Sequence, residues 1–377
     1  MTKILIFGDL HFKVDNIIQM KHYIEKIKYW LEQNAPPPDI FILLGDILHY
    51  HERLHTNALN QFDKMLSALC TFGKPIIILV GNHDMINHKQ YLSNHHWMNI
   101  LKHIPNIYII DHTQSFTIQN FTFVCCPYVP NGSFKQAIQD ILIQWVYNEN
   151  TFEIISQDIK NVDIYFAHQE FKGCSMGFIS SETGDEWELN MPFVLSGHIH
   201  QKQQPQQNIV YVGSAIQDGP FGGEYGIVSE LCIHENTIRN NTSYVIQYDS
   251  IQLHSYIQLK YYKLSIPQHI IKSYNIQEIT ENTIHQLVKL KQQTDLCETL
   301  KINIKSSIEE FKAFKKSIMF QTLQTNNIYI TLKPIEISTS ILDKEIEIPY
   351  FLKELEDILK NSEHSDMLLE LFYKCIQ

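Results

Sequence analysis

The sequence predicts an α/β fold in which buried strands alternate with covering helices. Short runs rich in Ile, Val, Leu and Phe recur through the first 230 residues. Runs without polar alternation suit central strands that are buried on both faces. Segments with apolar residues at three-to-four spacing, which is typical of helices, stand between several of these runs. Strands that alternate with helices favour a layered α/β architecture.

Five runs are expected to form the central strands, and each leads into a residue with a metal-capable side chain. They are Thr2–Phe7, Asp39–Leu44, Pro75–Val80, Val162–Ala167 and Phe193–Ser196. Helices are expected over Asn16–Gln33 and Asn57–Phe72, and further strands over Phe116–Cys125 and Ile227–His234. Active groups in such folds gather on loops at the carboxyl ends of the strands, so the polar residues that follow the five runs are expected to converge.

A second, smaller unit is expected after a boundary near residues 245–258. Its predicted elements are a strand at Tyr261–Ile266, a helix at Thr280–Gln293, a strand at Thr299–Ile304, a helix at Ser307–Thr322 and a strand at Ile328–Leu332. Two amphipathic helices, Tyr350–Lys360 and Ser365–Cys375, are expected to follow. The predicted domains are therefore residues 1–250, residues 255–335 and a helical pair over 345–377.

The composition indicates a folded chain that does not span a membrane. The 377 residues are 44% hydrophobic and 19% charged, which excludes a disordered chain. No apolar run approaches the ~18 residues of a membrane span. No signal-peptide pattern is present, so an intracellular, cytoplasmic protein is expected, with the nucleus or a viral replication site as alternatives. The seven cysteines form no CxxC pair, which favours scattered reduced thiols.

The charge is unevenly distributed along the chain. The net charge of −11 argues against a globally basic nucleic-acid binder, but not against local basic patches or metal-mediated phosphate binding. Residues 1–254 hold 15 Lys and Arg against 25 Asp and Glu, which gives −10. Residues 255–335 hold 11 against 6, which gives +5, and residues 336–377 hold 4 against 10, which gives −6. The middle block is therefore the electropositive one.

Four motifs carry the chemistry. Asp9-x-His11 and Gly45-Asp46 are common by chance, but Gly81-Asn82-His83-Asp84 is expected only about 0.002 times in a chain of this composition, and Gly197-His198-Ile199-His200 about 0.04 times. All four occur in order at the ends of predicted strands, and His168 follows a fifth strand. Their joint occurrence predicts a functional site.

The residue types at these positions are typical of a dinuclear metal site. Such a site needs hard oxygen donors and imidazoles around two ions that a carboxylate holds ~3.5–4 Å apart. Asp46 is the candidate for the bridging carboxylate. One ion is expected to bind Asp9, His11 and His200, and the other Asn82, His168 and His198. Oxygen and nitrogen donors without a thiolate favour manganese, iron or zinc over a structural zinc site, and a water shared by two cations is a nucleophile near neutral pH.

Several residues near these motifs are candidates for other roles. His83 is not needed as a ligand if Asn82 is one, and its protonated imidazole is placed to donate a proton to the leaving oxygen. One of His49, His51 and His55 is expected to lie beside His83 and tune it, with a solvent-facing role as the alternative. Arg53 is a candidate for substrate binding. Asp84 is expected to orient the imidazole of His83 or to cap a helix.

At these motifs the chain resembles the calcineurin-like metallophosphoesterases over roughly residues 1–230. Within that superfamily it is similar to the Mre-eleven/SbcD nucleases, which include the phage recombination endonuclease subunit. The similar segments are Gly45-Asp46-Ile47-Leu48-His49, Ala167-His168-Gln169-Glu170 and Val210-Tyr211-Val212-Gly213-Ser214-Ala215-Ile216-Gln217. The loop His51–His55 is richer in His than that family pattern, and Gly219-Pro220 is an insertion.

The resemblance implies a β-sandwich flanked by helices, followed by a smaller α/β capping domain and a C-terminal helical pair. It implies a DNA nuclease of double-strand-break repair or recombination, with exonuclease and endonuclease activity. The predicted catalytic residues of this nuclease are His83 and His49. Two Mn²⁺ per chain are implied, with Mg²⁺, Fe or Zn²⁺ as alternatives. The implied partners are DNA, an SMC-like (SbcC-type) ATPase and a second copy of the chain, bound through helices of the N-terminal half.

Three other functions stay open. A Ser/Thr phosphoprotein phosphatase of the same superfamily is disfavoured, because His49-Tyr50-His51 and Asp84 stand where those enzymes carry Asp-Arg-Gly and Glu. A cyclic-nucleotide phosphodiesterase is disfavoured only by the additional C-terminal units. A catalytically inactive scaffold is disfavoured because all seven ligand positions are metal-capable.

The two C-terminal segments carry further expectations. The lysines of the +5 block are expected to contact DNA, above all Lys312, Lys315 and Lys316, which fall on one predicted helix; a solvated helix face is the alternative. The predicted terminal helices carry two apolar stripes and are expected to dock on the ATPase. The alternative is that they pack back on the capping unit.

Overall fold

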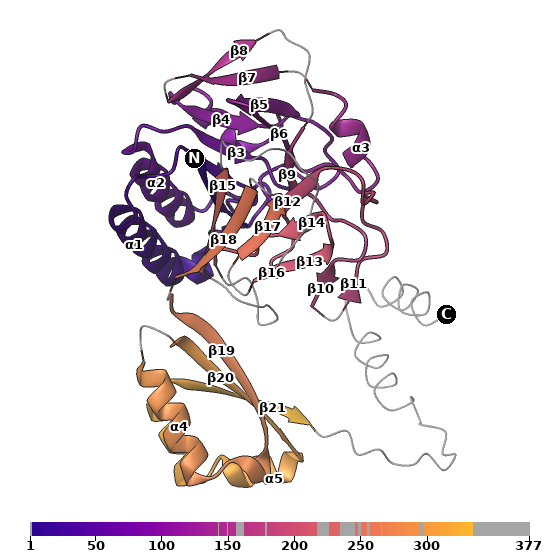
Figure 1. Ribbon diagram of the computed structural model, residues 1–377. Helices are drawn as coiled ribbons and strands as arrows, with labels where there is room; N and C mark the ends of the chain where they lie inside the picture. Colours follow the sequence, from indigo (N-terminus) through magenta and orange to yellow (C-terminus); the bar gives the residue numbers. More distant parts are fainter. Residues whose placement is uncertain are drawn as a thin grey trace, which may run out of the picture. The chain divides into compact units, whose positions relative to one another are not determined.

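A computed structural model shows a β-sandwich flanked by helices and a separate three-stranded unit (Figure 1). It describes residues 2–141, 143–148, 150–155, 162–177, 179–216, 226–233, 246–247, 250–254, 257–264, 266–293 and 297–334. The two predicted terminal helices, the insertion at Gly219-Pro220 and the end of the Val210–Gln217 motif lie outside these residues. The mixed α/β fold class predicted from the sequence is confirmed.

The first sheet of the sandwich has the strand order β16-β17-β18-β15-β1-β2-β3-β4. Its strands are β1 (Thr2–Phe7), β2 (Ile40–Leu43), β3 (Ile76–Leu79), β4 (Ile107–Ile110), β15 (Ile227–Ile233), β16 (Ile246–Gln247), β17 (Ser250–His254) and β18 (Ile257–Lys263). The strands β1 to β4 are parallel, whereas β15 runs antiparallel to β1 and to β18. The parallel half thus directs the loops after β1, β2 and β3 to one edge.

The second sheet has the order β13-β14-β12-β9-β6-β5-β7-β8. Its strands are β5 (Gln114–Ile118), β6 (Phe121–Cys126), β7 (Ile143–Asn148), β8 (Thr151–Ile155), β9 (Ile164–His168), β12 (Phe193–Gly197), β13 (Gln203–Gln206) and β14 (Ile209–Tyr211). The neighbours β6, β9, β12 and β14 are parallel. A small hairpin of β10 (Ser175–Met176) and β11 (Ile179–Ser180) stands apart from both sheets.

The two sheets pack face to face through alternate residues of their strands. Ile4, Ile6, Ile40 and Ile42 of the first sheet share a buried cluster with side chains of the second. The second-sheet members of this cluster include Phe116, Phe123, Ile164, Phe166, Phe193 and Leu195. Because successive side chains of a strand point to opposite faces, Leu5, Phe7, Phe41 and Leu43 are left to face helices. This double burial explains the continuous apolar runs in the sequence.

Helices cover the outer face of the first sheet. The main ones are α1 (Ile17–Gln33), which follows the 3₁₀ turn η1 (Val14–Asn16), and α2 (Thr56–Cys70). They bury Met20, Tyr23, Phe62 and Met65 against the odd-numbered strand residues named above. The remaining helical segments of the sandwich, among the described residues, are η2 (Trp97–Leu101) and α3 (Phe134–Ala137).

The smaller unit is a three-stranded sheet in the order β19-β20-β21 with helices packed on it (Figure 1). Its elements are β19 (Gln268–Asn275), η3 (Ile276–Glu278), α4 (Glu281–Gln292), β20 (Cys297–Ser306), α5 (Ile308–Phe314), α6 (Ile318–Thr325) and β21 (Ile328–Pro334). Its own apolar cluster joins Leu300, Ile302 and Ile304 of β20 to Leu287 of α4 and Phe311 of α5. This unit therefore has a core of its own.

Two element predictions need correction. The segment Phe116–Cys125 is two antiparallel strands, because the chain turns at Gln119, whose backbone is left-handed with a φ of 53°. The helix predicted over Ser307–Thr322 is broken, because Ser317 caps a new helix by accepting a hydrogen bond from the backbone N–H of Phe320. Lys315 and Lys316 consequently lie in a turn and not on one helix with Lys312.

The predicted domain boundary is too early as well. The sequence assigns Tyr261–Ile266 to the smaller unit, but β18 pairs with β15 through Ile227↔Lys263 to Ile233↔Ile257 and so belongs to the sandwich. The strand β18 lies between β15 and β17 in the first sheet, and the three-stranded unit begins with β19, a strand that the sequence reasoning missed. Gln268–Asn275 was missed because it holds few consecutive apolar residues.

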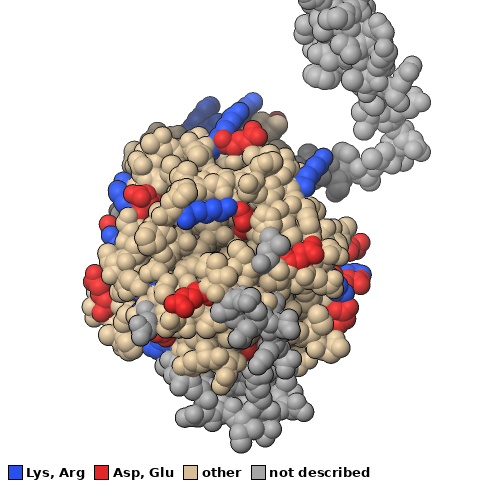
Figure 2. Space-filling view, turned by 90° about the horizontal axis from the view of Figure 1, so that it is seen from above, with Lys and Arg blue, Asp and Glu red and all other residues tan. Residues whose placement is uncertain are grey.

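Two surface features bear on function. None of the helices in the described residues is long and apolar enough to cross a membrane. Figure 2 shows one face of the molecule, on which basic and acidic side chains are interspersed wherever grey atoms do not cover it. Where it is visible, this face has no broad field of a single sign.

Candidate metal centre

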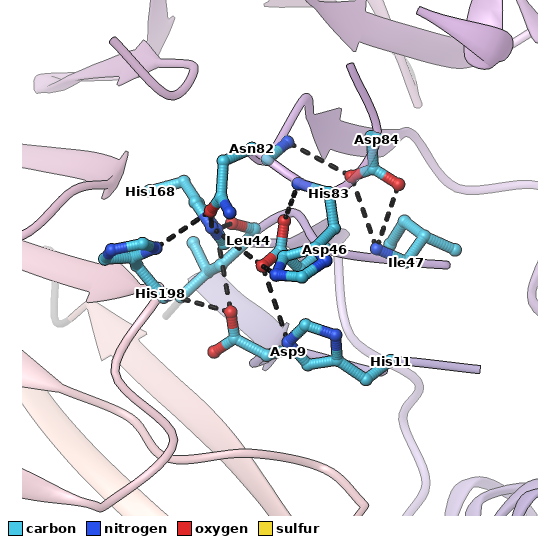
Figure 3. A network of polar contacts seen from close by, with 12 residues as sticks. Asp9, His11, Leu44, Asp46, Ile47, Asn82, His83, Asp84, His168 and His198 are labelled. Carbon is cyan, nitrogen blue, oxygen red and sulfur yellow. Dashed lines mark hydrogen bonds and ion pairs between the residues drawn. The ribbon is translucent and has the colours of Figure 1, made fainter. Parts of the chain in front are cut away.

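The seven predicted ligand residues all lie at or just beyond the carboxyl ends of five strands. Asp9 and His11 follow β1, Asp46 follows β2, and Asn82 follows β3. His168 is the last residue of β9, whereas His198 and His200 follow β12. The first three strands belong to one sheet and the last two to the other, so the site lies where the ends of the two sheets meet (Figure 3).

Six of these residues form two compact groups of donors. The ligand atoms of Asp9, His11 and His200 lie within 4.8 Å of one another, and so do those of Asp46, His168 and His198. Asp46 Oδ2 lies 3.3 Å from His168 Nε2 in its own group and 3.4 Å from His11 Nε2 in the other. This carboxylate therefore stands between the two groups, as a bridging ligand must.

Asn82 completes the second group. Its Oδ1 lies 3.0 Å from His168 Nε2 and 2.9 Å from His198 Nδ1 (Figure 3). The opposite ring nitrogen of His168 donates to the backbone oxygen of Leu44 over 2.7 Å. This bond fixes the tautomer that turns Nε2 toward Asn82 and Asp46. Metal-ligating histidines are commonly held in this way by a carbonyl oxygen.

The residues present fit a pair of divalent cations. Within the described part of the chain, Asp9 Oδ2 and His11 Nε2 are buried and have no hydrogen-bond partner. Burying such atoms unpaired costs free energy, and a cation would satisfy both of them. The donor set of carboxylates, an amide oxygen and imidazoles, without thiolate, suits manganese, iron or zinc.

The electrostatics of the site also call for positive charge. Burial raises the pKa of Asp9, an effect that His168 and His200 oppose. Burial alone would raise the pKa of Asp46, but His168, His11 and His83 hold it well below its usual range. Although burial lowers the pKa of His168, Asp46 and Asp9 raise it to about 9. The carboxylates of Asp46 and Asp9 thus make this part of the site favourable for positive charge.

Two other histidines are kept in the neutral form that binds metals. Burial and the neighbouring His200 lower the pKa of His11 well below its usual value. Burial and the neighbouring His168 lower the pKa of His198 to about 3. A neutral imidazole retains a nitrogen lone pair, which a metal ligand requires.

The backbone is strained at three of the seven positions. His11, Asp46 and His198 have φ values of 44°, 48° and 77°, a left-handed conformation that is uncommon for residues other than glycine. Such strain persists only where the surrounding structure imposes it, and it concentrates at functional sites. At these three positions the left-handed backbone directs each side chain toward the centre of the site.

Two glycines of the motifs leave space for the donors. A Cβ on Gly81 would lie 2.2 Å from Asp46 Oδ1, and a Cβ on Gly45 would lie 2.7 Å from His168 Nδ1. Gly45 also has a φ of 101°. Any side chain at either position would displace a candidate ligand, which explains the Gly in Gly-Asp and in Gly-Asn-His-Asp.

Asp84 does not contact the ring of His83, so the expectation that it orients this ring is wrong. Its buried carboxylate accepts hydrogen bonds from the backbone N–H groups of Ile47, Leu48 and Gly81 and from the indole of Trp97. It therefore ties the loop after β2 to the loop after β3. Burial and the neighbouring Asp46 raise the pKa of Asp84 to about 7.

His83 stands at the side of the two groups with one nitrogen turned toward them. Its Nδ1 donates to the backbone oxygen of His49 over 2.6 Å, and its Nε2 lies 4.0 Å from Asp46 Oδ2. The backbone N–H of His83 donates to Asp46 Oδ1 over 2.8 Å. The ring is about 29% exposed, so it contacts both the centre and the solvent.

His49 and His51 both lie beside His83, as expected for at least one of the three loop histidines. The rings of His49 and His51 stack on that of His83 with centroid distances of 5.3 and 5.0 Å. His49 also contacts His11, with 3.2 Å between the two Nδ1 atoms. The ring of His55 contacts Tyr50 instead.

The candidate substrate-binding residues are not part of this network. Arg53 is exposed in the loop before α2. Lys312, Lys315 and Lys316 are exposed in the three-stranded unit, where Lys315 lies 5.3 Å over the ring of Phe311. Their roles stay predictions.

Residues of the Val210–Gln217 motif contact the backbone of two candidate ligands. Ser214 Oγ donates to the backbone oxygen of Asp9 over 2.8 Å, and the N–H of Ser214 donates to the backbone oxygen of His200 over 2.9 Å. Gly213 adopts a φ of 87°, and its oxygen comes so close to Gly8 that a Cβ there would lie 1.9 Å away. The motif thus fixes the backbone of two candidate ligands.

Sequence reasoning missed Tyr128. Its ring centroid lies 5.7 Å from that of His198 and 6.3 Å from that of His168, and its backbone N–H donates to the backbone oxygen of Val80, which follows β3. It packs beside both imidazoles of the second group. The sequence offered one indication that Tyr128 lies near the site, which is its position after Cys125-Cys126-Pro127 at the end of a predicted strand.

A β-sandwich that gathers these donors at its strand ends defines a metallophosphoesterase. The family model for calcineurin-like phosphoesterase matches residues 2–202. The "Putative phosphoesterase 244L" of Invertebrate iridescent virus 6 is 40% identical over 84% of this chain and 98% of its own length. The "Putative phosphoesterase 078R" of Invertebrate iridescent virus 3 is 34% identical over 90% of this chain and 86% of its own. The chain belongs to the calcineurin-like phosphoesterase family and is a phosphoester hydrolase.

Proposed function

We propose that this protein is a metal-dependent DNA phosphodiesterase with exonuclease and endonuclease activity, acting in DNA repair or recombination. The observation that carries the proposal is the placement of His83 beside the two donor groups. Its Nδ1–H is held by a backbone oxygen, so Nε2 is the atom that faces the centre. An imidazole in this position is suited to donate a proton to the leaving oxygen of a phosphoester.

Two cations bound between the donor groups would supply an activated water and neutralise phosphate oxygens. The protein's own residues provide the rest. In hydrolysis a bond forms between the water oxygen and phosphorus, and the bond to the sugar oxygen breaks. The proton on His83 Nε2 passes to that leaving oxygen, and the electron pair of the broken bond stays on it. The carbonyl of His49 keeps the ring turned for this transfer.

The surroundings of the site support a diester over a monoester substrate. A terminal phosphate monoester is a dianion, and planar guanidinium groups are well suited to hold two of its oxygens. Among the described residues the only arginine is Arg53, which is exposed. The groups beside the centre are the imidazoles of His49, His51 and His83. This argument works against a phosphoprotein phosphatase.

The nuclease proposal draws on two further features. The motif at Val210–Ile216 that resembles the Mre-eleven/SbcD nucleases fixes the backbone of Asp9 and His200. The chain also continues past the sandwich into a folded unit with exposed lysines, which a phosphodiesterase of small cyclic nucleotides does not require. Manganese as the metal, an SMC-like ATPase as partner and a homodimer are part of the same proposal.

Cleavage assays with the purified full chain test the proposal. The substrates are short single-stranded DNA, duplex DNA, a 2′,3′-cyclic nucleotide and a phosphoserine peptide, each with Mn²⁺, Mg²⁺, Fe²⁺ or Zn²⁺. We expect DNA to be cut, with Mn²⁺ most effective, and Asp46→Ala to be inactive. Turnover of the cyclic nucleotide or the phosphopeptide without cleavage of DNA would reject the nuclease. Inactivity on every substrate would favour a scaffold.

The ATPase proposal has a separate test. Deleting residues 349–377 is expected to abolish co-purification with a candidate SMC-like ATPase while Mn²⁺-dependent cleavage of short single-stranded DNA continues. Retained co-purification contradicts the docking proposal. Aggregation of the truncated protein would mean that this segment packs on the chain's own core.

A further inference from the structure

We propose that His49 is a positioning residue for His11, and that its ring selects which nitrogen of His11 is offered to a metal ion. The proposal rests on the contact between the two imidazoles, whose Nδ1 atoms lie 3.2 Å apart. This role builds on the proposed function but differs from the catalytic role that the sequence analysis predicts for His49. It concerns the metal centre and not the leaving group.

The two nitrogens of His11 have different surroundings. Nε2 is buried and lies 3.4 Å from Asp46 Oδ2. As a residue, His11 belongs both to the donor group with Asp9 and His200 and to a group with His49 and His83. Nδ1 faces His49 Nδ1. A neutral imidazole carries one hydrogen, so a lone pair on Nε2 requires the hydrogen to be on Nδ1. His11 then donates from Nδ1, and His49 Nδ1 is the acceptor.

The arrangement follows a general requirement of metal-binding histidines. Such residues usually donate the other ring N–H to a carboxylate, a backbone oxygen or water, and the partner fixes both tautomer and ring orientation. For His168 that partner is the backbone oxygen of Leu44. For His11 the group in the equivalent position is the ring of His49, an acceptor only when its own hydrogen is on Nε2.

The backbone and the ring of His49 serve different groups. Its backbone oxygen accepts from His83 Nδ1, and its backbone N–H donates to the backbone oxygen of Phe12. Replacing the ring removes its stacking on His83 but leaves in place the backbone oxygen that accepts from His83 Nδ1. A change in the side chain of His49 should alter metal binding without removing the proton donor, which separates a positioning role from a catalytic one.

The test uses the full chain with three substitutions of His49. In His49→Asn an amide oxygen can take the place of Nδ1, in His49→Gln it lies nearer the place of Nε2, and His49→Leu has no acceptor. His55→Leu is the matched control, because His55 lies in the same loop and its ring contacts Tyr50. Mn²⁺ binding is measured by calorimetry and by electron paramagnetic resonance, which distinguishes a coupled Mn²⁺ pair from a single ion.

We expect His49→Leu and His49→Gln to bind one of the two ions about 10–100-fold more weakly, as for other partners of metal-ligating histidines. His49→Asn and His55→Leu should bind both ions like the wild type. At saturating Mn²⁺ the kcat of His49→Leu on single-stranded DNA should return to near the wild-type value. If His49→Leu does not fold, the test is the difference in Mn²⁺ affinity between His49→Asn and His49→Gln.

Two results would overturn the proposal. One is binding of both ions with wild-type affinity by His49→Leu or, should that variant not fold, by His49→Gln. The other is a kcat that stays low at saturating Mn²⁺ while both affinities are unchanged, which would assign His49 to the chemistry. The metal measurements need no substrate, so they stand even if DNA proves not to be cut and the proposed function fails.

Discussion

The sandwich and the three-stranded unit differ in whether they bury acidic and basic side chains. In the sandwich Asp9, His11, Asp46, Asp84 and His168 are almost completely buried at strand ends. In the three-stranded unit the described lysines and acids lie at the surface or half-buried, and Ser306 is its only polar residue classed as buried among those described. The sandwich therefore buries some of its charged side chains, whereas the described charged side chains of the three-stranded unit contact solvent.

This difference separates two kinds of binding. Buried charge is costly unless a partner compensates it, so a cluster of buried carboxylates and imidazoles is built for a specific cation. Exposed lysines contribute through long-range attraction that salt screens. Single substitutions should therefore have large effects at the strand ends, whereas several together are needed to change the behaviour of the smaller unit.

The largest effect is expected at the carboxylate between the two donor groups. Asp46→Ala should lose both metal ions and all detectable cleavage, because Asp46 Oδ2 is near a nitrogen of each group. The fold should survive, since the strands themselves are apolar. Metal content per chain, circular dichroism and DNA cleavage check this. Full activity, or a single ion per wild-type chain in excess Mn²⁺, would show that the site is not a bridged pair.

A smaller effect is expected at His83. His83→Ala should keep both metal ions and DNA binding but lower turnover by roughly 10²–10⁴-fold, the usual contribution of a positioned proton donor. Single-turnover kinetics together with Mn²⁺ titration make the comparison with Asp46→Ala direct. Loss of metal would place His83 among the ligands, and normal turnover would remove it from the chemistry.

A graded effect is expected in the smaller unit. Replacing Lys312, Lys315 and Lys316 by Glu should weaken DNA binding and flatten its salt dependence, by about 0.9 in the log–log slope for each phosphate that the protein no longer neutralises. The matched control replaces Lys21, Lys26 and Lys28, which are exposed on α1. Equal weakening in both variants would trace the effect to net charge, and an unchanged slope would leave these lysines as a solvated surface.

The smallest effect concerns a buried carboxyl that belongs to neither binding region. Burial alone would raise the pKa of Asp111. The neighbouring His96, Lys102 and His112 nevertheless hold this pKa well below its usual range. The unfolded value is about 3.9. A carboxyl whose pKa is lower in the folded state stabilises the fold above the unfolded pKa, and this contribution is lost as the pH falls through the folded pKa.

Asp111→Asn should therefore lower the free energy of unfolding by about 1–3 kcal/mol at pH 5.5, as expected for charge-assisted hydrogen bonds. The gap to the wild type should shrink as the pH falls below about 4. Urea unfolding of both proteins between pH 3 and 6 provides the measurement. A gap that widens in acid would mean that the folded pKa of Asp111 is raised instead.

The sandwich was more predictable from the sequence than the smaller unit, for a physical reason. A strand buried on both faces needs a continuous apolar run, and Thr2–Phe7 appears in the structure with the bounds that the sequence suggested. A strand with one covered face needs no continuous apolar run, and Gln268–Asn275 holds few apolar residues, so its signal is easily lost. The break at Ser317 depends on one capping hydrogen bond, which a helical period does not reveal.

Within the site, too, some features could be predicted from the sequence and others could not. The donors were found from spacing, because rare motifs stood at strand ends. The left-handed backbone at His11, Asp46 and His198 was beyond sequence reasoning, since tertiary contacts impose it. Asp84 was misassigned because its partners include the backbone N–H of Ile47 and the indole of Trp97, groups that sequence proximity to His83 does not indicate.

The pairing of β1 with β15 has a consequence for synthesis of the chain on the ribosome. Thr2 lies opposite Ile233 and Ile6 lies opposite Ser229, so one edge of the first strand stays without its partner until more than 220 further residues have been made. The backbone N–H of His198 donates to Asp9 across 189 residues. Contacts of such long range form late in folding. The nascent chain therefore carries an open, apolar strand edge through most of translation, and it gains a complete set of metal ligands only after the second sheet has emerged.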